Sequence, residues 1–109
     1  MRVITKVRLK KFWEKHPESE DAMLRFYREA RKATWHNYAE IKETFPAADT
    51  CGTCYIFDVQ GNNYRVIAKI HFPKFNEKLK RWEQGRVYIR AVMTHAEYAK
   101  DRWKRDCRG

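Results

Sequence analysis

The sequence predicts an α+β fold in which N-terminal helices pack on an antiparallel β-sheet and a C-terminal helix follows the sheet. Apolar residues recur at helical spacing through the first part of the chain, whereas residues 54–92 hold runs rich in β-branched and aromatic residues, separated by a turn signal and a charged connection. Helical runs followed by a meander of strands are typical of this class. The length of 109 residues predicts one domain, residues 1–109, with an extended connection over residues 73–86.

Three helices are predicted in the first part of the chain, after a short strand at residues 2–5. In the first helix, Leu9, Phe12 and Trp13 stand at positions i, i+3 and i+4 and share one face. Ser19 is a plausible N-cap for the second helix, and Pro46 ends the third. The predicted helices cover residues 7–16, 19–33 and 35–45.

Three strands and a fourth helix are predicted in the rest of the chain. The strands cover residues 54–59, 64–71 and 86–92. The turn signal at residues 60–62 joins the first two strands into a hairpin. Thr94 and Glu97 have the spacing of a capping box, which predicts a helix start there, with the helix continuing to about Arg105.

Alternation along the predicted strands separates an apolar face from a basic one. Val87, Ile89 and Ala91 fall on one face of their strand, and this face is expected to pack against the helices. The opposite, half-exposed face of the sheet then collects three cations and one aromatic residue: Arg65, Lys69, Arg90 and Tyr88. Cations that pair with phosphates beside a ring that stacks on bases suit a nucleic-acid platform. A merely solvated sheet face is the alternative.

The charge balance favours a polyanionic partner. The chain has 24 Lys and Arg residues against 14 Asp and Glu residues, a formal net charge of +10. Such an excess suits RNA, DNA, an acidic protein or a membrane surface. No run of apolar residues approaches the ~20 needed for a membrane span, and the first residues lead into charged sequence rather than a signal peptide. A cytoplasmic protein that does not cross a membrane is therefore expected.

Three cysteines make a disulfide framework improbable, so reduced thiols are expected. Cys51 and Cys54 have the spacing of a metal knuckle, but the sequence offers no second pair of ligands. No metal site and no cofactor are therefore predicted.

The side chains best suited to act as acid and base lie just after the third predicted strand. His95 can exchange protons near neutral pH, and Tyr98 can donate a hydrogen bond or a proton. Glu97 is explained more simply by the capping box. His71 lies at a strand end on the basic face, where it can contact a substrate.

The connection at residues 73–86 is basic and carries three apolar residues. Phe75, Leu79 and Trp82 stand at i, i+4 and i+7, which suits a short amphipathic helix or an extended hairpin tip. One interpretation is a solvated extension with Trp82 packed on its own domain. The other is an extra docking element for RNA or for a protein partner, with Lys80 and Arg81 among its phosphate contacts.

Several stretches together resemble the HigB family of type II toxin–antitoxin toxins, which share the RelE-like fold. The resemblance covers roughly residues 1–98 and is most specific in the hairpin at residues 57–66 and at residues 87–98, which end in Thr94-His95-Ala96-Glu97-Tyr98. Ala99 stands where the family usually has Asp, the connection at residues 73–86 is longer than usual, and the tail is unusually basic.

The resemblance implies a toxin that is an endoribonuclease, an mRNA interferase that cleaves mRNA on the ribosome without a metal ion. It implies attack by the RNA 2′-hydroxyl on the adjacent phosphate, neutralisation by a helix-turn-helix antitoxin of the HigA type, and binding of operator DNA through the antitoxin complex. The catalytic candidates are Arg65, Lys69, Arg90, His95 and Tyr98, and the RNA-binding candidates are His71, Tyr88, Lys80, Arg81, Lys100 and Arg102. A non-catalytic basic module that binds RNA or the ribosome, a decayed toxin, is the alternative.

Overall fold

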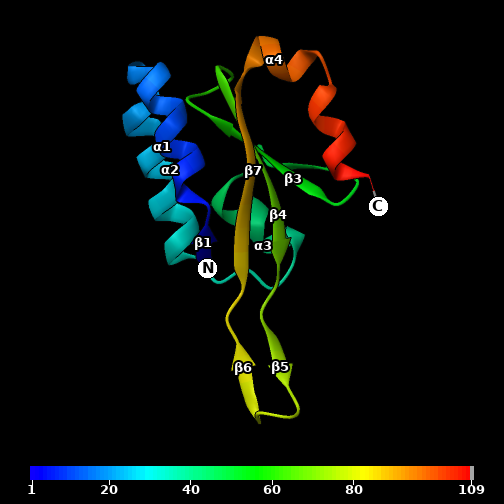
Figure 1. Ribbon diagram of the computed structural model, residues 1–109. Coiled ribbons are helices and arrows are strands. Elements are labelled where there is room, and N and C mark those ends of the chain that lie inside the picture. The colour runs from blue at the N-terminus through cyan, green and yellow to red at the C-terminus, as the bar shows by residue number, and fades with distance from the viewer. Residues whose placement is uncertain (109) are drawn as a thin grey trace.

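A five-stranded sheet forms the centre of the computed structural model, which describes residues 1–108 (Figure 1). The strand order is β1-β7-β4-β3-β2, and every neighbouring pair is antiparallel except β1 and β7, which are parallel. The predicted α+β class and the predicted short strand at the N-terminus are confirmed, whereas the parallel pairing of that strand with β7 and the short strand β2 were not predicted. The strands are β1 (Arg2–Ile4), β2 (Asp49–Cys51), β3 (Cys54–Val59), β4 (Tyr64–His71) and β7 (Arg86–Thr94).

The N-terminal helices cover one face of this sheet (Figure 1). They are α1 (Lys6–Lys15), the short 3-10 helix η1 (Pro17–Ser19), α2 (Glu20–Lys32) and α3 (Tyr38–Thr44). The first two predicted helices are confirmed to within a residue or two. The third begins later than predicted because the Asn37 side chain caps it, accepting a hydrogen bond of 3.0 Å from the Glu40 amide.

The main core lies between these helices and the sheet. Leu9, Met23 and Phe26 from the helices belong to one buried cluster with Phe57 of β3, and the ring centroids of Phe26 and Phe57 lie 5.1 Å apart. Alternate residues of β4 face the same core: Tyr64, Val66, Ala68 and Ile70. Burial of these apolar side chains fixes which face of the sheet is left for other contacts.

The opposite face of the sheet holds a second, smaller core. It is made of Cys54, Ile56, Ile67, Met93, Trp103 and Cys107. The predicted C-terminal helix through Arg105 is wrong, because α4 (His95–Ala99) ends early and Asp101 adopts a left-handed conformation with φ 61°. A 3-10 segment, η2 (Arg102–Cys107), then carries Trp103 and Cys107 onto the sheet.

A β-bulge at Arg90 breaks the alternation predicted for β7. Ala68 pairs with Ile89 and Ile67 pairs with Ala91, so Arg90 has no partner in β4. The prediction that Val87, Ile89 and Ala91 share a face is therefore wrong. Ala91 packs against the second core, while Ile89 belongs to the main core.

The expectation of reduced thiols is wrong for two of the three cysteines. Cys54 and Cys107 form a disulfide, and Cys51 is free and half-buried. The amide of Thr53 also donates a hydrogen bond of 2.8 Å to the carbonyl oxygen of Cys107. A Cβ atom on Gly52, whose φ is +56°, would lie 2.0 Å from that oxygen, so only glycine fits this close approach.

The connection at residues 73–86 forms a hairpin arm rather than an amphipathic helix. Its strands, β5 (Lys74–Asn76) and β6 (Arg81–Glu83), make a separate two-stranded sheet that extends away from the body (Figure 1). Trp82 is 66% exposed, so the interpretation in which it packs on its own domain is wrong. No helix among the described residues is long and apolar enough to cross a membrane.

Candidate active site

The candidate site lies on the sheet face opposite the helices, where β4 and β7 run side by side. Lys69 pairs with Tyr88 across the two strands, so both side chains stand on this face. The ring of His71 packs edge-on against that of Tyr88, with centroids 5.1 Å apart. Three of the predicted site residues therefore form one strip.

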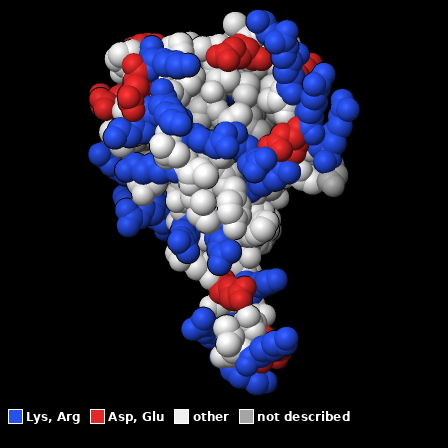
Figure 2. Space-filling model, viewed as in Figure 1, with Lys and Arg blue, Asp and Glu red and all other residues white. Residues whose placement is uncertain are grey.

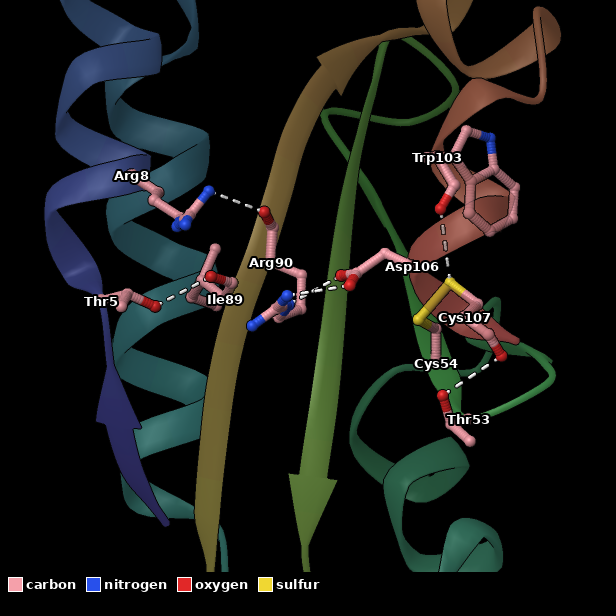
Figure 3. A network of polar contacts seen from close by, with 9 residues as sticks. All are labelled: Thr5, Arg8, Thr53, Cys54, Ile89, Arg90, Trp103, Asp106 and Cys107. Carbon is pink, nitrogen blue, oxygen red and sulfur yellow. Dashed lines mark hydrogen bonds and ion pairs between the residues drawn. A yellow bond between two sulfur atoms is a disulfide. The ribbon is translucent and has the colours of Figure 1, made fainter. Parts of the chain in front are cut away.

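Arg90 extends this strip and is held by the C-terminal segment (Figure 3). Its Nε and Nη2 atoms donate hydrogen bonds of 2.7 and 2.8 Å to the two carboxylate oxygens of Asp106. This two-pronged geometry is the strongest way in which arginine binds a planar anion. The backbone carbonyl of Arg90 accepts a further hydrogen bond of 2.9 Å from Nη1 of Arg8 on α1.

The carboxylate of Asp106 marks a position where several positive charges converge. The hydrogen bonds from Arg90 lower the pKa of Asp106, and the nearby charges of Arg90, Lys69 and Arg8 lower it further, against an opposing effect of desolvation. Three cations from α1, β4 and β7 thus act on one anionic group. The arrangement can hold a phosphate in the same way as it holds the carboxylate.

An open cleft of about 620 Å³ lies beside Arg90, between α1 and β7. It is lined by basic residues of α1 that the sequence analysis did not single out: Arg8, Lys11 and Lys15. Their spacing of i, i+3 and i+7 places them on one face of the helix. This spacing is visible in the sequence and could have identified them as a basic helix face. Figure 2 shows basic side chains spread widely over this side of the molecule, with few acidic ones between them.

Arg65 is not on a half-exposed face, and this correction changes its role. The residue is 6% exposed, and its Nε lies 3.0 Å from a carboxylate oxygen of Asp58. The guanidinium also donates to the carbonyl oxygen of Asn62 at 3.1 Å and to the Asn62 side chain. Its carbon atom Cζ lies 4.8 Å from the centre of the Tyr98 ring. Arg65 therefore fixes the hairpin and supports Tyr98 from within.

Tyr98 and His95 belong to the short helix α4, which leaves the end of β7. The Tyr98 ring stacks on Trp103 with centroids 5.0 Å apart, and the Trp103 indole donates a hydrogen bond of 2.9 Å to the Tyr98 carbonyl. The His95 side chain is exposed, while its amide donates to the carbonyl of Asn63 at 2.9 Å. The predicted capping box is confirmed, so Glu97 has the structural role that the sequence indicated.

The remaining predicted RNA-binding residues lie apart from this strip. Lys80 and Arg81 are exposed on the arm, and Lys100 and Arg102 are exposed where α4 leads into η2. Asp101 lies between the latter two, and it pairs with Lys104 at 3.3 Å rather than with the strip.

The chain matches a known protein family and several known proteins. The profile of the HigB toxin family, described as the RelE-like toxic component of a toxin–antitoxin system, matches residues 19–101. The chain belongs to the HigB toxin family. It is 32% identical to the mRNA interferase toxin HigB of Escherichia coli K12 over 101 residues, which is 90% of this chain and 88% of that protein.

Other HigB proteins give the same result. An mRNA interferase HigB of Shigella flexneri is 32% identical over 101 residues, again 90% of this chain and 88% of the relative. One of Escherichia coli O6:H1 is 29% identical over 103 residues, which is 92% of this chain and 90% of the relative. The predicted family and the RelE-like class of fold are confirmed.

The segment that holds Arg90 lies outside the part of the chain that the HigB profile matches. The matched residues end at 101, whereas Asp106 and Cys107 follow in η2. Among residues 1–108, no group of three or more His, Cys, Asp or Glu side chains is placed to hold a metal ion. Cys54, half of the suspected metal knuckle, is instead bonded to Cys107.

Proposed function

We propose that this member of the HigB family is an mRNA interferase, an endoribonuclease that cleaves mRNA on the ribosome and thereby arrests translation. The observation that carries the proposal is the position of the Asp106 carboxylate, held by Arg90 with Lys69 and Arg8 close by. An RNA phosphate in the same position would receive the same three charges. The names of the HigB relatives supply the substrate class.

The proposed reaction uses the RNA itself as the nucleophile and needs no metal ion. The 2′-oxygen attacks the adjacent phosphorus, and the bond from phosphorus to the 5′-oxygen breaks. A base removes the proton of the 2′-hydroxyl, and an acid protonates the departing 5′-oxygen. The products are a 2′,3′-cyclic phosphate and a free 5′-hydroxyl. The cations stabilise the charge that builds on the phosphoryl oxygens.

We assign roles to these residues from their exposure and their contacts. Arg90 and Lys69 bind the phosphate, and His95 and Tyr98 are the acid–base pair, with the order of the two left open. Arg65 is a positioning residue, because its guanidinium is buried and reaches the RNA only through the Tyr98 ring. His71 and Tyr88 continue the binding strip along the RNA, with Lys100 and Arg102 as outlying phosphate contacts.

Membership of the HigB family supports the proposed partners. The toxin acts in the cytoplasm on translating ribosomes and is neutralised by a helix-turn-helix antitoxin of the HigA type. The complex of the two binds operator DNA through the antitoxin.

Induced expression in cells that lack the antitoxin tests this function. We expect growth arrest, with cuts in cellular mRNA mapped by primer extension, and we expect neither from His95→Ala at equal protein level. Cleavage by purified protein on ribosomes at fixed magnesium should not depend on added zinc or manganese. Normal growth with intact transcripts would contradict the proposal.

One observation favours a second candidate, a basic module that binds RNA without cutting it. Ala99 follows Tyr98 at the end of α4, where the family usually has Asp, and a methyl group cannot exchange protons or accept a hydrogen bond. In that case the protein would bind ribosomes and leave mRNA intact in the same experiment.

A further inference from the structure

The arm, residues 74–83, is a built element rather than a loose loop. The side chain of Asn76 accepts a hydrogen bond of 3.1 Å from the Leu79 amide, which closes the turn. The same side chain donates a hydrogen bond of 2.6 Å to Glu83 on the opposite strand. Lys80 takes the left-handed conformation at the turn, with φ 52°. The arm therefore presents its outer side chains in a fixed arrangement.

The apolar residues of the arm are exposed. Phe75 and Trp82 are direct partners across the two strands, with ring centroids 5.9 Å apart and planes at 70°. Trp82 is 66% exposed, Phe75 41% and Leu79 55%. Of the four large apolar side chains that are exposed among residues 1–108, these are three. A cluster of this kind on a rigid projection marks an interaction site.

The charges around these rings are mainly positive. Residues 74–83 hold four basic and two acidic side chains, and Lys78, Lys80 and Arg81 flank the turn. At the base of the arm an open hollow of about 360 Å³ is lined by Lys74, His71 and Arg86 among others. His71 pairs with Arg86, two residues along β4 from the Lys69–Tyr88 pair, so basic residues follow the same face of β4 and β7 from the base of the arm towards Arg90.

We propose that the arm is an RNA-docking element that binds a segment with unpaired bases, one base stacking on Trp82 while Lys78, Lys80 and Arg81 contact the flanking phosphates. Exposed aromatic rings among cations are the combination that binds single-stranded RNA. The cations and the strip that leads to Arg90 favour RNA over a protein partner. The inference rests on the proposed function in so far as that function makes RNA the substrate.

The test measures binding separately from cleavage. The probe is a fluorescent single-stranded RNA with 2′-O-methyl groups throughout, which cannot be cut because the attacking hydroxyl is blocked. Trp82→Ala should weaken binding of this probe about tenfold, the loss expected for one stacked base. Trp82→Phe should recover most of it. Val7→Ala is the matched control, because Val7 is 54% exposed on α1, away from the arm.

The charges of the arm are tested through the salt dependence of the same binding. Replacing Lys78, Lys80 and Arg81 together by alanine should reduce the slope of log Kd against log salt by about 2, because three phosphate contacts to a single strand are lost. The control removes the same charge from the exposed face of α2, with Arg25, Arg28 and Lys32 replaced by alanine. That variant should keep the slope of the parent.

Three results would overturn the proposal. The first is equal binding of the single strand by the parent and by Trp82→Ala, with both proteins folded by circular dichroism. The second is an equal loss by Trp82→Ala towards the same RNA annealed into a duplex, since paired bases cannot stack on the ring. The third is a loss of antitoxin binding with RNA binding unchanged, which would make the arm a protein-docking element. Because the probe cannot be cleaved, none of these results depends on whether the proposed chemistry is correct.

Discussion

Arg90 connects three parts of the molecule through one residue. Its position in a β-bulge frees it from pairing with β4, and its guanidinium turns to Asp106 of the C-terminal segment. Its carbonyl meanwhile accepts a hydrogen bond from Arg8 of α1. A bulge commonly redirects a side chain beside a functional site, and here it turns a cation towards an anion.

Asp106→Asn should increase the affinity for the 2′-O-methyl RNA about threefold. The substitution removes a carboxylate that competes with phosphate for Arg90, and an ion pair that solvent reaches this freely contributes little, so the gain is small. Asp101→Asn removes the same charge from a carboxylate paired with Lys104 and should change affinity less. Equal effects of the two variants, measured by fluorescence anisotropy, would show that only net charge matters.

Arg65→Ala should reduce cleavage far more than Lys74→Ala. Loss of the buried guanidinium leaves Asp58 unpaired and removes the support of Tyr98, which should also cost about 2 kcal/mol of stability. Lys74 is exposed on the arm, where its charge is screened. Cleavage assays at a temperature where both variants remain folded separate the loss of activity from the loss of stability. Equal activities of the two variants would refute the assigned role of Arg65.

The pairing of Asp106 predicts how the C-terminal segment responds to acid. Because the pKa of Asp106 is lowered in the folded protein, the ion pair contributes its full stability above the unfolded pKa of about 3.9 and loses it as pH falls through the folded value. The NMR signal of the Trp103 indole, which is bonded to Tyr98, should therefore shift only in strong acid. In Asp106→Asn this shift of the Trp103 signal with acid should be missing. If the shift persists, it is caused by the titration of another group.

At the scale of elements, the parts of the fold that the sequence could not predict are those that depend on contacts of the C-terminal segment. Helices α1 and α2 were predictable because their apolar spacing is local, and so were β3, β4 and their turn. The contacts of η2 join residues far apart in sequence: the Cys54–Cys107 bond spans 53 residues, and Trp103 enters a core with Ile67. The buried state of Arg65 depends on the same contacts, since Tyr98 and Trp103 help to cover this face.

Cys107→Ser should lower the free energy of unfolding by about 4 kcal/mol under oxidising conditions. Loss of the disulfide frees a loop of some fifty residues in the unfolded chain, and chain entropy gives a cost of this size. Cys51→Ser is the matched control and should change stability little, because Cys51 is free. Urea titrations of both variants with and without a dithiol reductant provide the measurement. Equal stability of parent and Cys107→Ser without reductant would contradict the disulfide.

At the scale of the whole molecule, positive charge is organised rather than merely abundant. Basic side chains line the α1 cleft, the strip on β4 and β7, and the arm, and others lie on α2 and in the C-terminal segment. The molecule is 45 Å long, and the projecting arm lies along its length (Figure 1). A composition count predicts a polyanionic partner, but only the fold shows that the α1 cleft and the strip on β4 and β7 meet at Arg90.

The most direct test of the proposed function is the chemistry of the cut ends. The purified protein is added to ribosomes stalled on a defined mRNA, and the ends of the fragments are identified. The account predicts a 5′-hydroxyl on the downstream fragment and a 2′,3′-cyclic phosphate on the upstream one, with no cut by Arg90→Ala or by His95→Ala. Intact mRNA, or fragments with a 5′-phosphate, would contradict it.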